Sequence, residues 1–142
     1  MKFTNLMKKK GEKLEPYEFL VTPEFNQQYL FAVEDFHPRY WDEKYGQPIV
    51  HPSLLLNQSN ATRSPGFCLP PGVAAIHTQD ETQFINPGKV GKRFKVTWEI
   101  VEEYDKRGRH YQVIDTVVVD EDGTEILRRR AHVTYFQGKG GE

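Results

Sequence analysis

The sequence has little of several features that would narrow its function at once. Cys68 is its single cysteine, so no internal disulfide can form. That scarcity is typical of a reducing compartment, and we expect a cytoplasmic protein. No apolar run reaches the length that spans a membrane, and residues 1–16 lack the apolar centre of a signal peptide.

The chain also lacks an excess of one charge. Its 19 basic and 20 acidic residues leave a formal net charge of -1. Nothing in this balance favours a nucleic-acid or membrane partner. The basic runs at residues 8–10 and 128–130 are short and typical of solvated surface. The histidines show no spacing typical of metal ligands, so we expect neither a metal nor a cofactor.

What is present is enough for one core. The sequence is 37% hydrophobic and 13% aromatic over 142 residues, which is typical of a single packed domain. We predict a polar arm at residues 1–16, one domain at residues 17–137 and a flexible tail at residues 138–142.

Helical signals lie in the first half of the chain. Residues 22–35 begin with a capping Thr22 and with Pro23 at the first helical position. The predicted apolar face of this helix consists of Phe25, Tyr29, Ala32 and Val33. A second short helix is expected at residues 39–45. A third, at residues 52–64, opens on Pro52 and contains three adjacent leucines, which predicts a helix buried on most sides.

Strand signals lie in the second half. Residues 73–85, 92–105, 109–122 and 125–136 are long candidates, and residues 17–21 form a short one. Lys106-Arg107-Gly108 and Asp122-Gly123 are typical hairpin turns. We therefore predict an α+β fold in which a long antiparallel sheet wraps around the helix at residues 52–64.

Three segments together resemble the MaoC-like hydratase/dehydratase family, which has the hotdog fold. These are FAVEDFHPRYWDE, QPIVHPSLLL and QFINPGKVGKRF, and with LEPYEFLVT the likeness covers residues 14–136. In active members, the resemblance implies hydration of a trans-2-enoyl thioester or its reverse. An Asp and a His then move protons, and a backbone N–H at the start of the central helix polarises the thioester carbonyl.

The resemblance places Asp35 at the family's Asp, but two other positions differ. Tyr40 takes the place of the catalytic His, and a tyrosine with an ordinary pKa near ~10 is a poor base at neutral pH. His37 takes the place of an Asn and is a candidate to supply the missing imidazole, or only to cap a turn. Pro52 takes the place of the glycine whose N–H polarises the carbonyl, and proline has no N–H.

We therefore consider Asp35, His37 and Tyr40 as candidate catalytic residues. Candidate substrate-binding residues are His51, Pro52 and Ser53; the first matches a family histidine that contacts the ligand or orients the loop. The departures look most like the FAS-one-like N-terminal dehydratase branch, in which one hotdog half is often non-catalytic.

Three functions follow as hypotheses. The first is a degenerate subunit that binds an acyl-CoA or acyl-carrier thioester beside a catalytic partner. The second is a self-sufficient enoyl-thioester hydratase/dehydratase that uses Asp35 with His37 or Tyr40, and the third is an acyl-CoA thioesterase. Since a hotdog sheet leaves an open edge strand, we expect a homodimer or a heterodimer with a second hotdog subunit. The acyl chain length and the carrier stay open.

Overall fold

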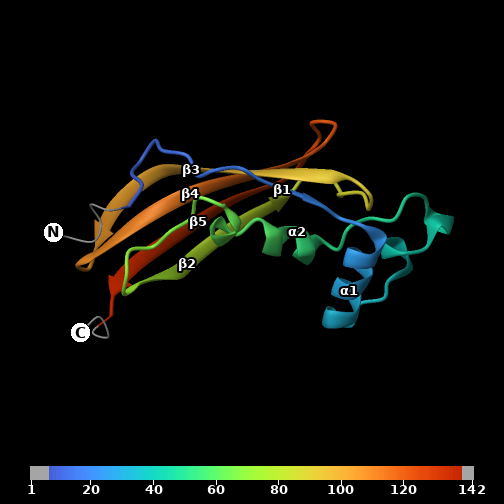
Figure 1. The fold of residues 1–142 in the computed structure, drawn as a ribbon, viewed down its shortest axis with the longest axis horizontal. Coiled ribbons are helices and arrows are strands. Elements are labelled where there is room, and N and C mark those ends of the chain that lie inside the picture. Colours follow the sequence, from blue (N-terminus) through green and yellow to red (C-terminus); the bar gives the residue numbers. More distant parts are fainter. Residues whose placement is uncertain (1–6, 139–142) are drawn as a thin grey trace.

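The computed structural model describes residues 7–138, which form a five-stranded antiparallel sheet with short helices (Figure 1). Residues 1–6 of the predicted arm and 139–142 of the predicted tail lie outside this range. The sheet has the order β1-β3-β4-β5-β2. Its strands are β1 (Tyr17–Leu20), β2 (Val73–Phe84), β3 (Arg93–Lys106), β4 (Arg109–Asp120) and β5 (Glu125–Gln137). The helices are α1 (Pro23–Val33), η2 (Pro38–Tyr40), η3 (Glu43–Tyr45), α2 (Pro52–Gln58) and η4 (Ala61–Arg63).

The predicted strands are confirmed to within two residues at each end. The Arg107-Gly108 turn between β3 and β4 has positive φ at both positions, 52° and 76°, as a two-residue hairpin of this twist requires. Residues before β1 run beside β3, where the Leu14 N–H donates to the Trp98 carbonyl. Leu14 is itself 8% exposed and belongs to the core.

Two helical predictions need correction. The helix expected at residues 39–45 is two 3-10 turns, because the Asp42 carboxylate caps a new turn at Lys44. The helix expected at residues 52–64 ends at Gln58. There the Ser59 hydroxyl donates a hydrogen bond to the Leu56 carbonyl, which ends the helical bonding pattern. Residues 61–63 then form a separate 3-10 turn, η4.

The buried side of α1 also differs from the prediction. The two buried residues of α1 are Asn26 and Leu30, while Ala32 and Val33 are exposed. Phe25 and Tyr29 are only partly buried. The reason is that α1 lies at the end of the sheet (Figure 1). Its buried side therefore includes Asn26, which bonds to the segment that leads into α2.

The core lies between α2 and one face of the sheet. Leu54 and Leu55 of α2 are 1% and 2% exposed and pack into one cluster with strand residues. The strand residues of that cluster include Phe94, Val96, Trp98, Ile100, Ile114, Val118 and Leu127. The wrapping of the sheet around the central helix is therefore confirmed, although the helix has only seven residues.

The segment that leads into α2 is fixed to the loop between β2 and β3. The Val50 N–H donates to the Gly88 carbonyl at 2.8 Å, and the Val90 N–H donates to the Pro48 carbonyl at 2.9 Å. A Cβ atom at Gly88 would lie 3.0 Å from side-chain atoms of Leu55 and Phe94, so a larger residue there would require the core side chains to shift. These contacts set the point at which α2 begins.

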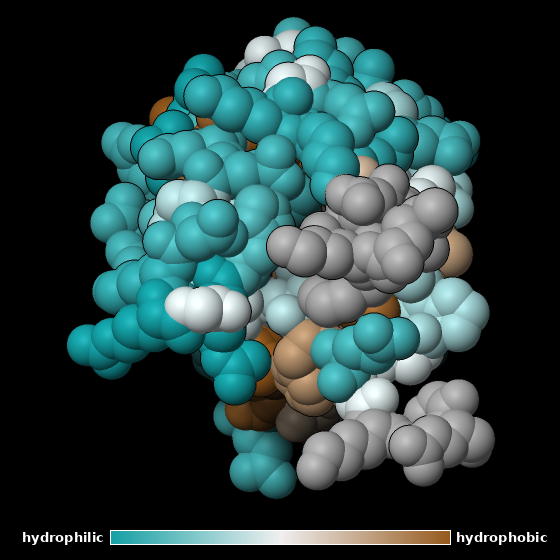
Figure 2. Space-filling view, turned by 90° about the vertical axis from the view of Figure 1, so that its left-hand side faces the viewer, coloured by the Kyte–Doolittle hydropathy of each residue, from teal (hydrophilic) through white to brown (hydrophobic). Residues whose placement is uncertain are grey.

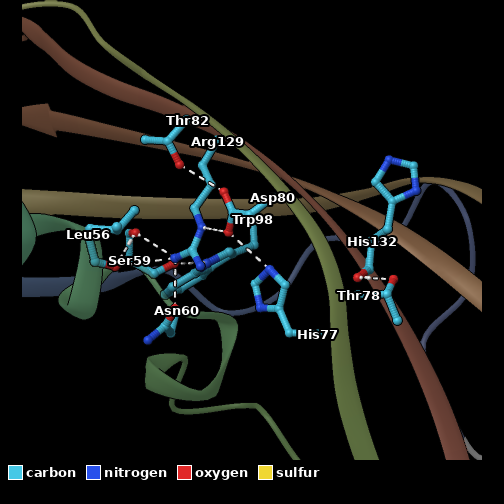
Figure 3. Close-up of polar contacts among 10 residues, drawn as sticks. All are labelled: Leu56, Ser59, Asn60, His77, Thr78, Asp80, Thr82, Trp98, Arg129 and His132. Atoms are coloured by element: carbon cyan, nitrogen blue, oxygen red, sulfur yellow. Dashed lines mark hydrogen bonds and ion pairs between the residues drawn. The ribbon is translucent and has the colours of Figure 1, made fainter.

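Arg129 on β5 fixes the other end of α2. Its Nη1 group donates to the Leu56 carbonyl, the Ser59 hydroxyl and the Asn60 side-chain oxygen, and its Nε group donates to Asp80 on β2 (Figure 3). The Arg129 side chain is 8% exposed. It therefore satisfies carbonyl and side-chain oxygens that a short helix end leaves open.

No helix among residues 7–138 is both long enough and apolar enough to span a membrane. The end of the molecule away from α1 has a mainly hydrophilic surface with a smaller hydrophobic area (Figure 2). The most exposed of the large hydrophobic side chains include four in α1 and the turns after it, at Phe31, Phe36, Trp41 and Tyr45.

We expect Arg129→Met to lower the free energy of unfolding by about 2–4 kcal/mol, because Asp80 and three oxygens at the end of α2 would lose their donor. Arg128→Met is the matched control. It removes an exposed pair with Glu125 on the same strand, which solvent screens, and should lower the free energy of unfolding far less than Arg129→Met. Urea unfolding of both variants measures the difference, and equal losses would contradict the role given to Arg129.

Candidate functional site

The centre of the candidate site is a contact between Asp35 and His51. Asp35 follows α1, where its N–H donates to the Leu30 carbonyl, and His51 is the residue before α2. The Asp35 Oδ2 and His51 Nε2 atoms lie 3.0 Å apart. The carboxylate side chain is 43% exposed and the imidazole is 14% exposed, so a ligand can reach the pair from the carboxylate side.

The other ring nitrogen of His51 fixes its tautomer. The Ser53 N–H donates to His51 Nδ1 at 3.2 Å, so this nitrogen carries no proton when the ring is neutral. The proton is then on Nε2, which donates it to Asp35. The Ser53 hydroxyl lies 2.9 Å from Nδ1 and 2.8 Å from the Tyr29 hydroxyl, which extends the hydrogen-bonded chain into α1.

Tyr40 covers the imidazole. Its ring centroid is 4.9 Å from that of His51, with an angle of 35° between the planes. Burial and the nearby Asp35 carboxylate both raise the pKa of Tyr40 above its ordinary value. The phenol therefore stays protonated at neutral pH and is suited to packing or to donating a hydrogen bond, not to accepting a proton from water.

His37 lies beside the pair without bonding to it through its side chain. Its N–H donates to Asp35 Oδ1 at 3.3 Å, and its Nδ1 accepts from the Arg39 N–H at 3.2 Å. The imidazole thus caps η2 and meets the Tyr40 ring edge at 6.0 Å between centroids. This geometry fits the capping alternative, while a catalytic role for His37 stays a prediction.

The start of α2 has its backbone donors already in use. Pro52 stands at the first helical position and has no N–H. The Ser53 N–H donates to the His51 imidazole, and the Leu54 N–H donates to the His51 carbonyl at 3.0 Å. His51 thus caps the helix that follows it, and none of these three residues offers a free N–H to a thioester carbonyl.

The sequence reasoning missed Asn26, which holds the site together. This buried side chain, 1% exposed, donates from Nδ2 to the Tyr40 carbonyl at 3.1 Å and to the Ile49 carbonyl at 3.3 Å. Its Oδ1 accepts the His51 N–H at 3.1 Å. A polar residue between apolar neighbours on a helix was the available signal, but it reads equally well as a solvent-facing position.

The predicted residues therefore fall into one cluster. Asp35, Tyr40 and Ser53 each contact His51, Pro52 begins the helix beside them, and His37 lies at the margin. Within residues 7–138, no group of three or more His, Cys, Asp or Glu side chains is arranged to hold a metal ion. The chemistry available is proton transfer between a carboxylate and a neutral imidazole.

No protein-family model matches the sequence, and no curated protein sequence matches it significantly. Solved structures do match in fold. The MaoC-like dehydratase from Rhodospirillum rubrum has a TM-score of 0.76 at 16% identity, over 96% of this chain and 97% of that one. The R-hydratase PhaJ1 from Pseudomonas aeruginosa has a TM-score of 0.71 at 22% identity, over 95% and 89%.

A third match is a chain of the ChsH1-ChsH2 complex from Mycobacterium tuberculosis. It has a TM-score of 0.71 at 15% identity and covers 90% of this chain and 98% of that one. All three likenesses extend over nearly the full length of both chains. The chain thus has the hotdog fold of MaoC-like dehydratases and hydratases, as the motifs predicted.

We expect Asn26→Leu to displace both His51 and Tyr40, because three partly buried backbone groups would lose the side chain that bonds them. The free energy of unfolding should fall by about 2–4 kcal/mol. Gln28→Leu, at an exposed position of the same helix, should change it by less than about 0.5 kcal/mol. In NMR spectra, the His51 ring signals should shift in the first variant only. Unchanged His51 signals in Asn26→Leu would contradict the positioning role.

Proposed function

We propose that this chain is an acyl-thioester-binding subunit of the MaoC-like hydratase/dehydratase family, with a degenerate site that acts beside a catalytic hotdog partner. The fold and the Asp35–His51 pair support binding at the place where this family handles thioesters. The proposal concerns a CoA or carrier thioester, with no cofactor. Asp35, Tyr40 and His51 would line the thioester end of the site.

The observation that carries this proposal is the state of the α2 N-terminus. Hydration of an enoyl thioester needs a donor for the oxygen on which negative charge develops. Pro52 has no N–H, and the next two N–H groups both donate to His51. A thioester carbonyl at this place would therefore have no preorganised backbone donor from α2.

A second candidate is a self-sufficient hydratase/dehydratase, favoured by the 3.0 Å contact between Asp35 and His51. Here Asp35 accepts a proton from water as the water oxygen bonds to the β-carbon of the enoyl group. The α-carbon takes up a proton from His51 Nε2, and Asp35 passes the proton it accepted from water to His51, so one water is added across the double bond. In this candidate His51 takes the role that the sequence offered to His37 or Tyr40.

An assembly with a second hotdog chain is proposed from β2. This strand is the edge of the sheet, and all of its twelve residues except Val73 and Thr82 are exposed. A long open edge invites pairing with another strand. We propose that β2 pairs with a second copy or with a related hotdog subunit, as the described match to a two-chain complex also favours.

In sedimentation velocity, we expect the chain to run as a dimer, and Ile76→Lys to shift it toward monomer. Ile76 is 44% exposed on the open edge, where a charge opposes strand pairing. Val33→Lys is the control, since Val33 is 42% exposed on α1, away from this edge. A monomeric wild-type chain at micromolar concentration would argue against pairing between identical copies.

Restoring the missing donor tests the degenerate site. We expect the wild-type chain to bind saturated butanoyl-CoA but to hydrate crotonyl-CoA weakly. In Pro52→Gly the helix regains an N–H at its first position, and hydration should rise by about 10²–10³-fold, the usual contribution of one such donor. Loss of enoyl absorbance measures turnover, and calorimetry measures binding.

Two further variants complete this experiment. Pro52→Gly combined with Asp35→Asn should return to the wild-type rate, because the carboxylate that accepts the proton from water would be absent. Pro87→Gly controls for a general gain in flexibility, since Pro87 is exposed in the loop that contacts the same segment and begins no helix. Rapid wild-type turnover that Pro52→Gly does not change would reject the degenerate site and favour the second candidate. Release of CoA would indicate a thioesterase.

A further inference from the structure

A cavity of about 610 Å³ lies between α1 and residues 36–48. Its walls are mainly apolar and aromatic, with Leu30 and Phe31 from α1 and Phe36 and Trp41 from the segment after it. A volume of this size with few polar groups is typical of a small-molecule site. None of the proposed chemistry has used this cavity.

The aromatic walls are held in place before any ligand binds. The Trp41 indole N–H donates to the Phe36 carbonyl at 2.9 Å, which fixes the plane of the indole. The Phe31 and Phe36 rings pack edge to face with centroids 5.0 Å apart. All three side chains stay 49–62% exposed, so the walls are ordered and open at the same time. Covering them with an apolar group would remove this area from water.

The cavity adjoins the candidate site through Tyr40. One part of this side chain packs on the His51 ring, and another part lines the cavity. Phe36, a second lining residue, directly follows Asp35 in the chain. A ligand whose reacting end lies at the Asp35–His51 pair can therefore place an attached apolar group in the cavity.

The polar residues of the cavity select among apolar ligands. Glu43 contributes a carboxylate to the lining, together with Gln27 and Gln47. The Gln47 amide is engaged, since its Nε2 donates to the Val90 carbonyl at 2.7 Å. A carboxylate at the wall opposes a free fatty acid but accepts a neutral acyl group.

We propose that this cavity binds the apolar acyl group of a thioester whose carbonyl end lies at Asp35 and His51. The inference rests on the proposed function and adds a substrate class to it: neutral medium-chain or ring-containing acyl groups, not short acyl groups or free acids. Trp41 and Phe31 would be residues that determine chain-length specificity.

A rival location for the acyl group lies on the other side of α2. A cavity of about 260 Å³ there is lined by Ala75, Val133 and Arg129, among others. Trp98 lies close to that cavity, because its indole donates to the carbonyl of Ser59, another lining residue. The two tryptophans of the chain, Trp41 and Trp98, thus report on the two locations separately.

The test uses bromine at the end of the acyl chain, which quenches an indole only on close contact. The probes are 10-bromodecanoyl-CoA and 10-bromodecanoyl-N-acetylcysteamine, each compared with its unbrominated form. We expect the brominated probes to quench wild-type fluorescence, and Trp41→Phe to lose this quenching. We also expect affinity to rise by about fourfold per methylene from butanoyl- to decanoyl-CoA, from about 0.8 kcal/mol per buried methylene.

A matched pair of variants tests the walls. Phe36→Ser keeps the backbone carbonyl that orients Trp41 and should weaken decanoyl binding about tenfold or more, while butanoyl-CoA binding changes little. Tyr45→Ser removes a similarly exposed ring, 53%, on the same segment but outside the cavity, and should leave both unchanged.

Several results would overturn the proposal. Quenching that persists in Trp41→Phe would place the acyl chain near Trp98. Absence of bromine quenching in the wild type would show that the acyl group does not bind in the cavity. A change of sedimentation in Phe36→Ser without a change in decanoyl affinity would make the aromatic walls an interface between copies. Quenching of Trp41 by both brominated probes, together with rapid hydration of crotonyl-CoA by the wild type, would support the cavity while rejecting the degenerate site of the proposed function.

Discussion

The candidate site depends on one buried carboxamide. Asn26 reaches from α1 to the carbonyl groups of Tyr40 and Ile49 and to the N–H of His51, and so joins α1, the turn after it and the start of α2 through one side chain. A buried amide with three hydrogen bonds is stable only when all its partners keep their places. Each lost partner leaves a buried polar group with no hydrogen bond to protein or water, which costs free energy. The orientation of α1, the turn after it and the start of α2 is therefore a single arrangement. The Asp35–His51 contact follows from it, since these two residues come from segments that Asn26 joins.

The same arrangement explains why the α2 N-terminus offers no donor. A helix of seven residues leaves most of its terminal N–H and C=O groups without partners inside the helix. At its C-terminal end Arg129 takes the Leu56 carbonyl, and at its N-terminal end the His51 ring takes the Ser53 N–H. With proline at the first position, local satisfaction of the backbone and polarisation of a thioester compete for the same groups. In this chain the free N–H groups at the start of α2 bond to His51. These bonds stabilise the helix and leave no N–H of α2 to polarise a thioester carbonyl, which hydration needs.

The sequence predicted the sheet well and the site only in part, for different physical reasons. Strand alternation and the turn at Arg107-Gly108 are local, so they are readable without knowing the rest of the chain. The central helix was predicted six residues too long because its end is set by Ser59 and by the distant Arg129, neither of which marks a helix end in the local pattern. Asp35 was identified by its motif, but its pairing with His51 instead of His37 depends on how α1 and α2 meet.

Tyr40 belongs both to the candidate site and to the aromatic cavity beside it. In the family's pattern this position holds the histidine that moves protons; here a phenol with a raised pKa stays protonated and cannot act as a base near neutral pH. The larger ring, however, does two things that an imidazole there would do less well. It covers His51, which keeps that ring away from water, and it forms a wall of the aromatic cavity beside Trp41. Compared with a histidine at this position, the tyrosine is therefore a poorer base and a larger apolar surface. A change of that kind is expected in a subunit that holds an acyl group while the carbonyl chemistry is completed elsewhere.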